Sequence, residues 1–199
     1  MVLTTSSVSE MPDTETLSLI DKKLTLYKFP SAGGKGGSKF DSGCNPYGVA
    51  RVHIECSPFN GIHFGPYKST IARIFMDFRQ PTTSHADKNQ FYWGFDVVAS
   101  KHKKTFNFEL TPGDSICKAI VWSDGFAANA VQFHTRLGII SPMYGIAPDN
   151  SKPTEFQAPE GTDYHLVGFH GRFGAIIDSL GFTFASLEHE DIPDSISEL

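Results

Sequence analysis

The sequence has few of the residues that hold covalent or metal-linked scaffolds together. Its three cysteines, Cys44, Cys56 and Cys117, are an odd number, and no two of them have the CxxC spacing of a zinc or redox site. None of the eight histidines belongs to an HExxH motif or a similar ligand pattern. His165 and His170 fall at strand spacing, so we expect them to point to opposite faces. We therefore predict no disulfide framework, no metal site and no cofactor.

Positive charge and long hydrophobic runs are also lacking. Seventeen Lys and Arg residues against 22 Asp and Glu residues give a formal net charge of -5 and a pI near 5.9, whereas nucleic-acid binders usually carry a basic patch. The only basic run contains Lys101, Lys103 and Lys104, and we expect it in a solvated turn. No apolar segment is long enough to span a bilayer. We expect neither a nucleic-acid partner nor membrane insertion.

The N-terminus lacks the parts of a secretory signal peptide. The segment MVLTTSSVSEMPDTETLSL has neither a basic region nor an apolar one. A cytoplasmic location is the expectation, although secretion by an unconventional route would leave the same sequence. We expect the polar residues 1–21 to form an extension outside the core, residues 22–186 to form the folded domain, and residues 187–199 to form a solvated acidic tail.

What the sequence does contain is typical of short strands joined by turns. Hydrophobic residues make up 40% of the 199 residues and aromatic residues 13%, which is enough for one domain with a substantial core. The 18 Gly and 12 Pro residues are spread along the chain and favour turns. Strand-like segments lie at 23–29, 48–56, 70–78, 91–98, 105–110, 116–122, 130–135, 137–140, 164–170 and from 176 onward, and residues 147–159 read as a Pro-rich loop. Without amphipathic helical segments, the pattern predicts an all-β sandwich, barrel or prism.

A loop with four glycines, SAGGKGG, spans Ser31 to Gly37. Such a loop is compatible with phosphate binding, but the GxxxxGK spacing that precedes Ser or Thr in a P-loop is absent. The dinucleotide fingerprint GxGxxG opens a helix, whereas this loop continues toward Gly43 and Pro46. Both nucleotide-binding motifs are therefore set aside.

A second glycine-bounded turn lies in the stretch VGFHGRFGAIIDSLGFTF, from Val167 to Phe184. Gly171 and Gly174 bracket this turn and permit backbone angles that a Cβ disfavours. After the turn, a period-2 pattern predicts Ile176, Leu180, Phe182 and Phe184 on one face of a strand, with Ile177, Ser179 and Thr183 on the other.

Asp178 is the polar residue that stands out in this stretch. With a strand beginning near Ala175, its carboxylate lies close to the turn, and the N–H groups of Ala175 and Ile176 open toward the same space. A carboxylate beside free amides offers the acceptors and donors that two neighbouring sugar hydroxyls need. Alternatively, Asp178 only caps its own turn. Asp41 is the other acid near a Gly-rich loop, and we expect it to form local turn bonds.

The order of several segments resembles the jacalin-related lectins, mannose-binding type. The matching segments are GGKGGSKFD at 33–41, FELTPGDSICKAIVWSDG at 108–125, VQFHTRLG at 131–138, PMYG at 142–145 and VGFHGRFGAIIDSLG at 167–181. Together they reach from about Leu24 to Ala185. The resemblance implies a β-prism I fold, in which three four-stranded antiparallel sheets have pseudo-threefold symmetry. It also implies that carbohydrate binds without metal at one apex, where the first Gly-rich loop meets a loop with a GxxxD motif.

The resemblance assigns five site residues. Gly174 and Asp178 match the ends of GxxxD, and Gly37 matches the glycine whose N–H approaches the sugar. Ala175 and Ile176 match positions that donate backbone N–H groups, while Asp178 accepts from two hydroxyls. Family members that favour galactose are cut just before the glycine at position 37. The intact chain here therefore implies partners with mannose or glucose, as glycans or glycoproteins.

The middle third, 61–102, matches the family poorly and has no second GxxxD, so we expect one site per chain and a homo-oligomer for multivalent binding.

We interpret the aromatic cluster at 91–95 as part of the core. A platform on which sugars stack is the second interpretation, and both stay open. An enzyme is not expected, because a glycosidase needs two carboxylates and no second acid accompanies Asp178 in a motif. The alternatives are a β-prism interaction or structural domain without sugar binding and, in second place, a glycan-processing enzyme.

Overall fold

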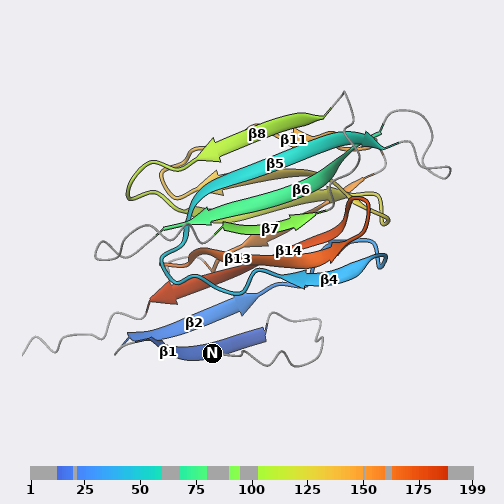
Figure 1. The fold of residues 1–199 in the computed structure, drawn as a ribbon. Coiled ribbons are helices and arrows are strands. Elements are labelled where there is room, and N and C mark those ends of the chain that lie inside the picture. Colours follow the sequence, from blue (N-terminus) through green and yellow to red (C-terminus); the bar gives the residue numbers. More distant parts are fainter. Residues whose placement is uncertain are drawn as a thin grey trace, which may run out of the picture.

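The computed structural model contains β-strands and connecting loops, with no helix among the residues that it describes (Figure 1). These residues are 13–19, 22–59, 68–79, 90–94, 103–149, 151–159 and 163–187. Within these ranges no helix has the length and hydropathy that crossing a membrane requires. The predicted all-β class is confirmed.

Three antiparallel sheets make up the fold. The first has the order β1-β2-β14-β13-β4, with β3 also paired to β14, and consists of β1 Asp13–Leu19, β2 Lys22–Lys28, β3 Ala32–Gly33, β4 Ser38–Asp41, β13 His165–Phe173 and β14 Ile177–Leu187. The second has the order β7-β6-β5-β8 and consists of β5 Val49–Phe59, β6 Lys68–Phe78, β7 Gln90–Gly94 and β8 Lys104–Glu109. The third has the order β11-β10-β9-β12 and consists of β9 Ile116–Ser123, β10 Ala128–Thr135, β11 Tyr144–Gly145 and β12 Lys152–Gln157.

These sheets form the expected prism, with two differences in strand count. The second and third sheets have the expected four strands, whereas the first has six. One additional strand is the two-residue β3, which pairs with β14 inside the Gly-rich loop. The other is β1, which lies in the polar N-terminal segment and pairs with β2 along its whole length.

Apolar side chains from all three sheets meet in a common core. The largest fully buried rings belong to Phe133, Phe156, Phe169, Phe182 and Phe184. Phe182 of β14 contacts Phe133 of β10 and Phe156 of β12 edge to face, with centroid distances of 5.9 and 5.3 Å. Each such burial stabilises the fold by about 1.5–3 kcal/mol. A smaller cluster of Leu24, Leu26, Val167 and Ala185 buries the opposite face of the first sheet.

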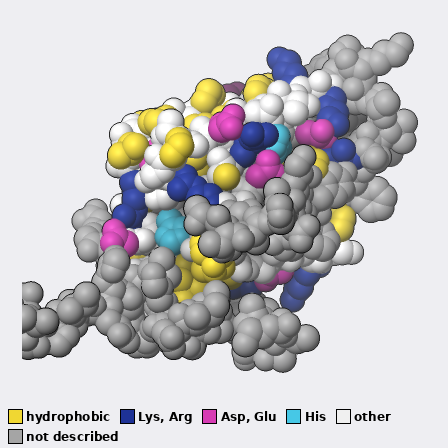
Figure 2. Space-filling model, turned by 60° about the vertical axis from the view of Figure 1, so that its left-hand side comes forward, with side chains coloured by type: hydrophobic (Ala, Val, Ile, Leu, Met, Phe, Trp, Pro, Cys, Tyr) yellow, Lys and Arg dark blue, Asp and Glu magenta, His cyan; other side chains and the backbone are white. Residues whose placement is uncertain are grey.

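The exposed face of the second sheet is polar. Arg51 Nη2 donates to Glu109 Oε1 at 3.0 Å, and His53 lies 2.5 Å from Asn107 Oδ1 and 3.2 Å from Asp77 Oδ2. Figure 2 shows basic, acidic and histidine side chains next to one another on the face that it draws, with hydrophobic side chains beside them. Cross-strand pairs of this kind each stabilise a sheet by a fraction of a kcal/mol, about 0.2–1.

Most predicted strands are present, but two segments in the third sheet differ from the prediction. The expected strand piece at 137–140 is wrong, because Thr135 accepts from Gly138 N in a turn and only an isolated bridge joins His134 to Ile140. The Pro-rich segment 147–159 contains strand β12, which pairs with β9. Pro153 is tolerated there because β12 is an edge strand, where a missing N–H leaves no ladder bond unmade. Residues 95–98 and the side chains of 90–94 lie outside the described part of the chain.

Two β-bulges overturn predictions that assumed strict alternation. Phe173 pairs with Ile177 and Arg172 pairs with Ser179, so Asp178 is an extra residue on β14. Ile177 therefore enters the core with Leu180, Phe182 and Phe184, and Ile176, although buried, stays outside this core cluster. The predicted facing of Ile176 and Ile177 is wrong because a bulge shifts the pleat by one residue.

The second bulge lies between Leu166 and Gly168 of β13. It places His165 opposite Ala185 and His170 opposite Gly181, four positions apart on β14. Residues four apart in a regular strand share a face. The two histidines therefore lie on the same face, and the prediction that they point to opposite faces is wrong.

Candidate functional site

Two loops that are distant in the sequence meet beside β13 and β14. The Gly-rich loop begins at β3, which pairs with Ser179 and Leu180 of β14, and ends at β4, which pairs with β13 from Phe173 to His170. Both ends of this loop are thus tied to the β13–β14 hairpin (Figure 1). Gly34 N also donates to Asp178 O at 2.7 Å. This pairing brings the loop against the bend at 174–176.

Three of the predicted site residues, Gly37, Gly174 and Asp178, lie together. A Cβ on Gly37 would collide with Phe173 O and Asp178 Oδ2, and Gly37 has a φ of +61°. A Cβ on Gly174 would lie 3.4 Å from Asp178 Oδ2, and one on Gly36 would lie 3.1 Å from Oδ1. Glycine is required at position 37 because only a bare backbone fits so close to the carboxylate.

The bulge at Asp178 explains how its carboxylate reaches this point. The extra residue frees Asp178 from the cross-strand register while Ile177 and Ser179 remain buried. Its Oδ2 atom is buried and has no hydrogen-bond partner. Burial raises the pKa of the Asp178 carboxyl above its ordinary value, and the nearby Arg172 guanidinium opposes this shift. Since no described group donates to this oxygen, a role limited to capping its own turn is not supported.

Arg172 holds the Gly-rich loop in place. Its Nε donates to Gly36 O at 2.7 Å and its Nη2 donates to Gly37 O at 2.8 Å. Hydrogen bonds from a charged donor are stronger than neutral ones, and the planar guanidinium fixes two carbonyls at once. The sequence analysis assigned no role to Arg172, although its position between Gly171 and Gly174 was a signal that it borders the turn.

The remaining predicted residues, Ala175 and Ile176, form the bend itself. Gly174 N donates to Ile176 O at 2.9 Å, which closes the turn. Ala175 is exposed and Ile176 is buried. Within the described residues, no group accepts a hydrogen bond from the N–H of Ala175 or Ile176. The two amides thus have no acceptor in the described part of the chain, and they lie three and two residues before Asp178.

A third loop, between β9 and β10, borders the same place. Asp124 Oδ1 accepts from Phe126 N at 3.0 Å and Ala127 N at 3.1 Å, so it shapes this loop. Phe126 O lies against Gly34, where a Cβ would collide with it, and Phe126 itself is 66% exposed. The sequence analysis assigned no site residue to this loop. An aromatic residue directly after Asp124 and Gly125 was the available signal.

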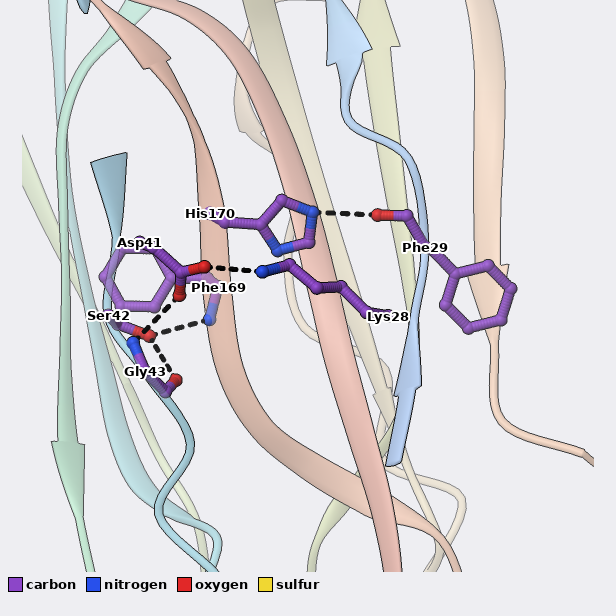
Figure 3. Close-up of polar contacts among 7 residues, drawn as sticks. All are labelled: Lys28, Phe29, Asp41, Ser42, Gly43, Phe169 and His170. Atoms are coloured by element: carbon purple, nitrogen blue, oxygen red, sulfur yellow. Dashed lines mark hydrogen bonds and ion pairs between the residues drawn. The ribbon is translucent and has the colours of Figure 1, made fainter. Parts of the chain in front are cut away.

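Asp41 has partners of its own, which Figure 3 shows. Its Oδ1 accepts from Gly43 N at 2.9 Å and its Oδ2 pairs with Lys28 Nζ at 2.5 Å. The predicted local turn bonding of Asp41 is confirmed, and Asp41 also forms an ion pair.

Figure 3 also shows His170, whose Nε2 donates to Phe29 O at 2.8 Å. Burial and the Lys28 ammonium lower the pKa of His170 to about 4, so this histidine is neutral at pH 7.

No group of three or more His, Cys, Asp or Glu side chains within the described ranges is arranged to hold a metal ion. The three loops therefore supply one carboxylate, free amides, glycine backbone and one exposed ring as the groups available to a ligand.

Residues 29–183 match the family model of the jacalin-like lectin domain. This chain belongs to the jacalin-like lectin family.

The curated relatives of this jacalin-like lectin are plant proteins. Jacalin-related lectin 36 of Arabidopsis thaliana is 27% identical over 175 residues, which cover 84% of this chain and 33% of the relative. Jacalin-related lectin 32 of the same plant is 29% identical over 170 residues, covering 80% of this chain and 48% of the relative. The chain thus spans only about a third to a half of the length of these relatives.

Solved structures of jacalin-related lectins share the fold. Single-chain recombinant jacalin matches with a TM-score of 0.60 at 15% identity, covering 90% of this chain and 98% of that one. Artocarpin in complex with methyl α-mannose matches with a TM-score of 0.57 at 17% identity, covering 79% and 95%. The predicted family and the β-prism are therefore confirmed. The family as a whole consists of carbohydrate-binding proteins that are not enzymes, which supports carbohydrate binding by this member.

Proposed function

We propose that this jacalin-like lectin binds mannose- or glucose-type glycans, without metal, where the Gly-rich loop meets the 174–178 loop. The observation that carries the proposal is the buried Asp178 Oδ2, which has no partner and lies against the backbone of Gly37 and Gly174. A buried acceptor without a partner carries a desolvation penalty of about 1–3 kcal/mol, or more when it is charged. A ligand hydroxyl that donates to it removes this penalty.

The chemistry of a hexose fits this set of groups. Two neighbouring hydroxyls donate to the two carboxylate oxygens of Asp178, and sugar oxygens accept from the N–H groups of Ala175 and Ile176. Glycine at position 37 lets the sugar approach the backbone. In this proposal the exposed ring of Phe126, whose backbone borders the Gly-rich loop, packs against the apolar face of the sugar. All of these groups belong to the protein itself, so binding proceeds without a metal ion.

The preference for mannose or glucose has indirect support. Artocarpin was solved with methyl α-mannose and with mannotriose, and a mannose-binding lectin from champedak shares the fold at 16% identity with a TM-score of 0.56. In this chain Gly37 lies within an uninterrupted Gly-rich loop. We also propose that the chain forms a homo-oligomer, because a single small polar site binds a monosaccharide with a Kd on the order of millimolar, and several linked sites raise the avidity.

Binding is favoured over hydrolysis by the state of the neighbouring acids. A glycosidase needs a second carboxyl about 5–9.5 Å from the first. Asp41 is paired with Lys28, and Asp124 accepts from two N–H groups of its own loop. Neither acid is free to act with Asp178.

The proposal is tested by a glycan array probed with the wild-type chain, Asp178→Ala and Asp41→Ala, each with and without EDTA. We expect mannose- and glucose-terminated glycans to retain the wild type and Asp41→Ala, with or without EDTA, and to lose Asp178→Ala. Asp41→Ala is the matched control because it removes an acid near the same loop but outside the site. An absence of wild-type binding to every glycan would favour an interaction domain, and loss of binding in EDTA would contradict metal-free recognition.

A further inference from the structure

Three basic residues lie in or next to the two loops of the candidate site, although the chain as a whole has a formal net charge of -5. Lys35 lies in the Gly-rich loop and Lys39 in β4, and both are exposed. Neither ammonium group forms an ion pair with a described residue. Arg172 adds a third cation between the two loops, because its guanidinium is bound to Gly36 O and Gly37 O.

The acids nearby leave this charge uncompensated. Asp124 is engaged by N–H groups of its own loop, and Asp41 is neutralised by Lys28. Among the described acids of these loops and of β4, Asp178 alone keeps a buried carboxylate oxygen without a partner, and it is the residue that accepts sugar hydroxyls in the proposed function. The same described segments contain three cations, Lys35, Lys39 and Arg172.

The register of the sheet makes this arrangement costly for the empty protein. Lys39 of β4 lies directly opposite Arg172 of β13. Like charges in directly opposed positions destabilise an antiparallel pair. The Arg172 guanidinium holds the Gly-rich loop through its hydrogen bonds, but no described acidic group compensates the positive charge of Lys39. An anion bound beside these strands would relieve the repulsion and would be attracted by Lys35 as well.

We propose that the preferred glycan carries an anionic substituent, a phosphate, a sulfate or a uronate carboxylate, which contacts Lys35 and Lys39 while the sugar ring occupies the Asp178 site. This inference rests on the proposed function, since it uses the same site and adds the charge of the ligand. The shared chemistry is an oxyanion attached to a hexose. Lysine and arginine are the side chains that recognise such groups.

The test is a calorimetric titration with methyl α-mannoside, mannose 6-phosphate, mannose 6-sulfate and glucuronate. At about 0.01 M salt we expect the best anionic sugar to bind about tenfold more tightly than the neutral one, and at about 1 M salt, where the Debye length is about 3 Å, the advantage should nearly vanish. The anionic sugar with the largest gain in affinity over methyl α-mannoside identifies the preferred substituent.

Variants localise the effect. Lys35→Gln and Lys39→Gln should each reduce the anionic advantage by about two- to fivefold, as expected for exposed charge pairs, and leave methyl α-mannoside binding unchanged. Lys104→Gln is the matched control, because Lys104 is an exposed lysine on β8 of the second sheet and its loss changes the net charge equally. Lys104→Gln should leave both affinities unchanged.

The outcomes separate this inference from the proposed function. Equal affinity for neutral and anionic sugars, or an equal effect of Lys104→Gln, overturns the anionic preference while neutral binding still stands. Inorganic phosphate or anionic lipid vesicles could also bind in a way that needs Lys35 and Lys39 but is unchanged in Asp178→Ala. That result overturns the preference for an anionic sugar, because the surface then binds negative charge alone. Failure of the proposed function gives a different result, because then the binding of neutral and of anionic sugars is unaffected by Asp178→Ala.

Discussion

Replacing Gly37 by alanine should abolish sugar binding for a reason that can be separated from backbone strain. Gly37 has a φ of +61°, and a Cβ there would collide with Phe173 O and Asp178 Oδ2. Gly43 has nearly the same backbone angle, +67°, yet a Cβ there would meet nothing within 4 Å. The two positions therefore share the strain of a left-handed residue and differ in the collision.

The strain alone is worth about 1–2 kcal/mol for a residue with a Cβ. For a chain of this size that corresponds to a fall in Tm of about 2–8 °C. We expect Gly43→Ala to show this fall and to bind methyl α-mannoside like the wild type. Gly37→Ala should lose at least about tenfold in affinity, equivalent to about 1.4 kcal/mol, because the loop or the carboxylate must move.

Melting curves and calorimetric titration of both variants decide the matter. Wild-type affinity in Gly37→Ala would refute the claim that the bare backbone at this position forms part of the site. Equal losses of affinity in both variants would show that loop strain, rather than the collision with Asp178, controls binding.

Three further predictions concern the neighbouring groups. Arg172→Met removes both hydrogen bonds to Gly36 and Gly37 and should weaken methyl α-mannoside binding at least about tenfold, because even one hydrogen bond from a charged donor is worth about 1.5–3 kcal/mol; unchanged affinity by titration would contradict a positioning role. Phe126→Ala should weaken binding about two- to tenfold without lowering the Tm, since its exposed ring contributes about 0.5–1.5 kcal/mol of packing to the sugar; an unchanged Kd would remove Phe126 from the site. Acidification should abolish binding as the pH falls through the pKa of Asp178, which burial raises above its ordinary value of 3.8. The same raised pKa means that ionisation of Asp178 lowers the stability of the folded protein as the pH rises. Asp178→Asn should therefore have a higher Tm than the wild type at pH 7, and a lower Tm would contradict the direction of the pKa shift.

Much of the fold follows from local chemistry. Alternating apolar residues and Gly- or Pro-containing turns place most strands within a few residues of their observed bounds. Strand β12 escaped this reasoning because Pro153 and the neighbouring prolines are typical of a loop, whereas an edge strand tolerates proline. The turn at Gly138 replaced an expected strand piece because its positive φ ends the extended conformation.

The bulges at Asp178 and between Leu166 and Gly168 could not be predicted from the pattern. A bulge inserts one residue into the pairing without changing the composition of the strand, so strict alternation assigns the wrong face to everything on one side of it. The error mattered most at Asp178, whose position depends on that extra residue. Isolated sequence patterns contain no information on which partner residue is skipped.

The candidate site was predictable only where a motif marks it. The strand and turn pattern already singled out Asp178, the resemblance to a family added Gly37 and Gly174 as site residues, and the structure brings the three together through the pairing of β3 with β14 and β4 with β13. Arg172 and Phe126 have roles that arise from contacts between loops distant in the sequence. No local spacing rule identifies such contacts.

The central claim is that Asp178 accepts the hydroxyls of a bound hexose. Titration of methyl α-mannoside into the wild type, Asp178→Ala and Asp178→Asn, with melting curves of all three, tests it most directly. Charge-assisted hydrogen bonds contribute about 1.5–3 kcal/mol each, so losing two should reduce the affinity about a hundredfold or more in Asp178→Ala. Asp178→Asn should also fail, because the amide keeps the shape but loses the charge and half of the acceptors. Both variants should remain folded, since the core beside them is supplied by Ile177, Leu180 and Phe182. Wild-type affinity in Asp178→Ala, or a loss of binding that occurs only because the variant unfolds, would contradict the account.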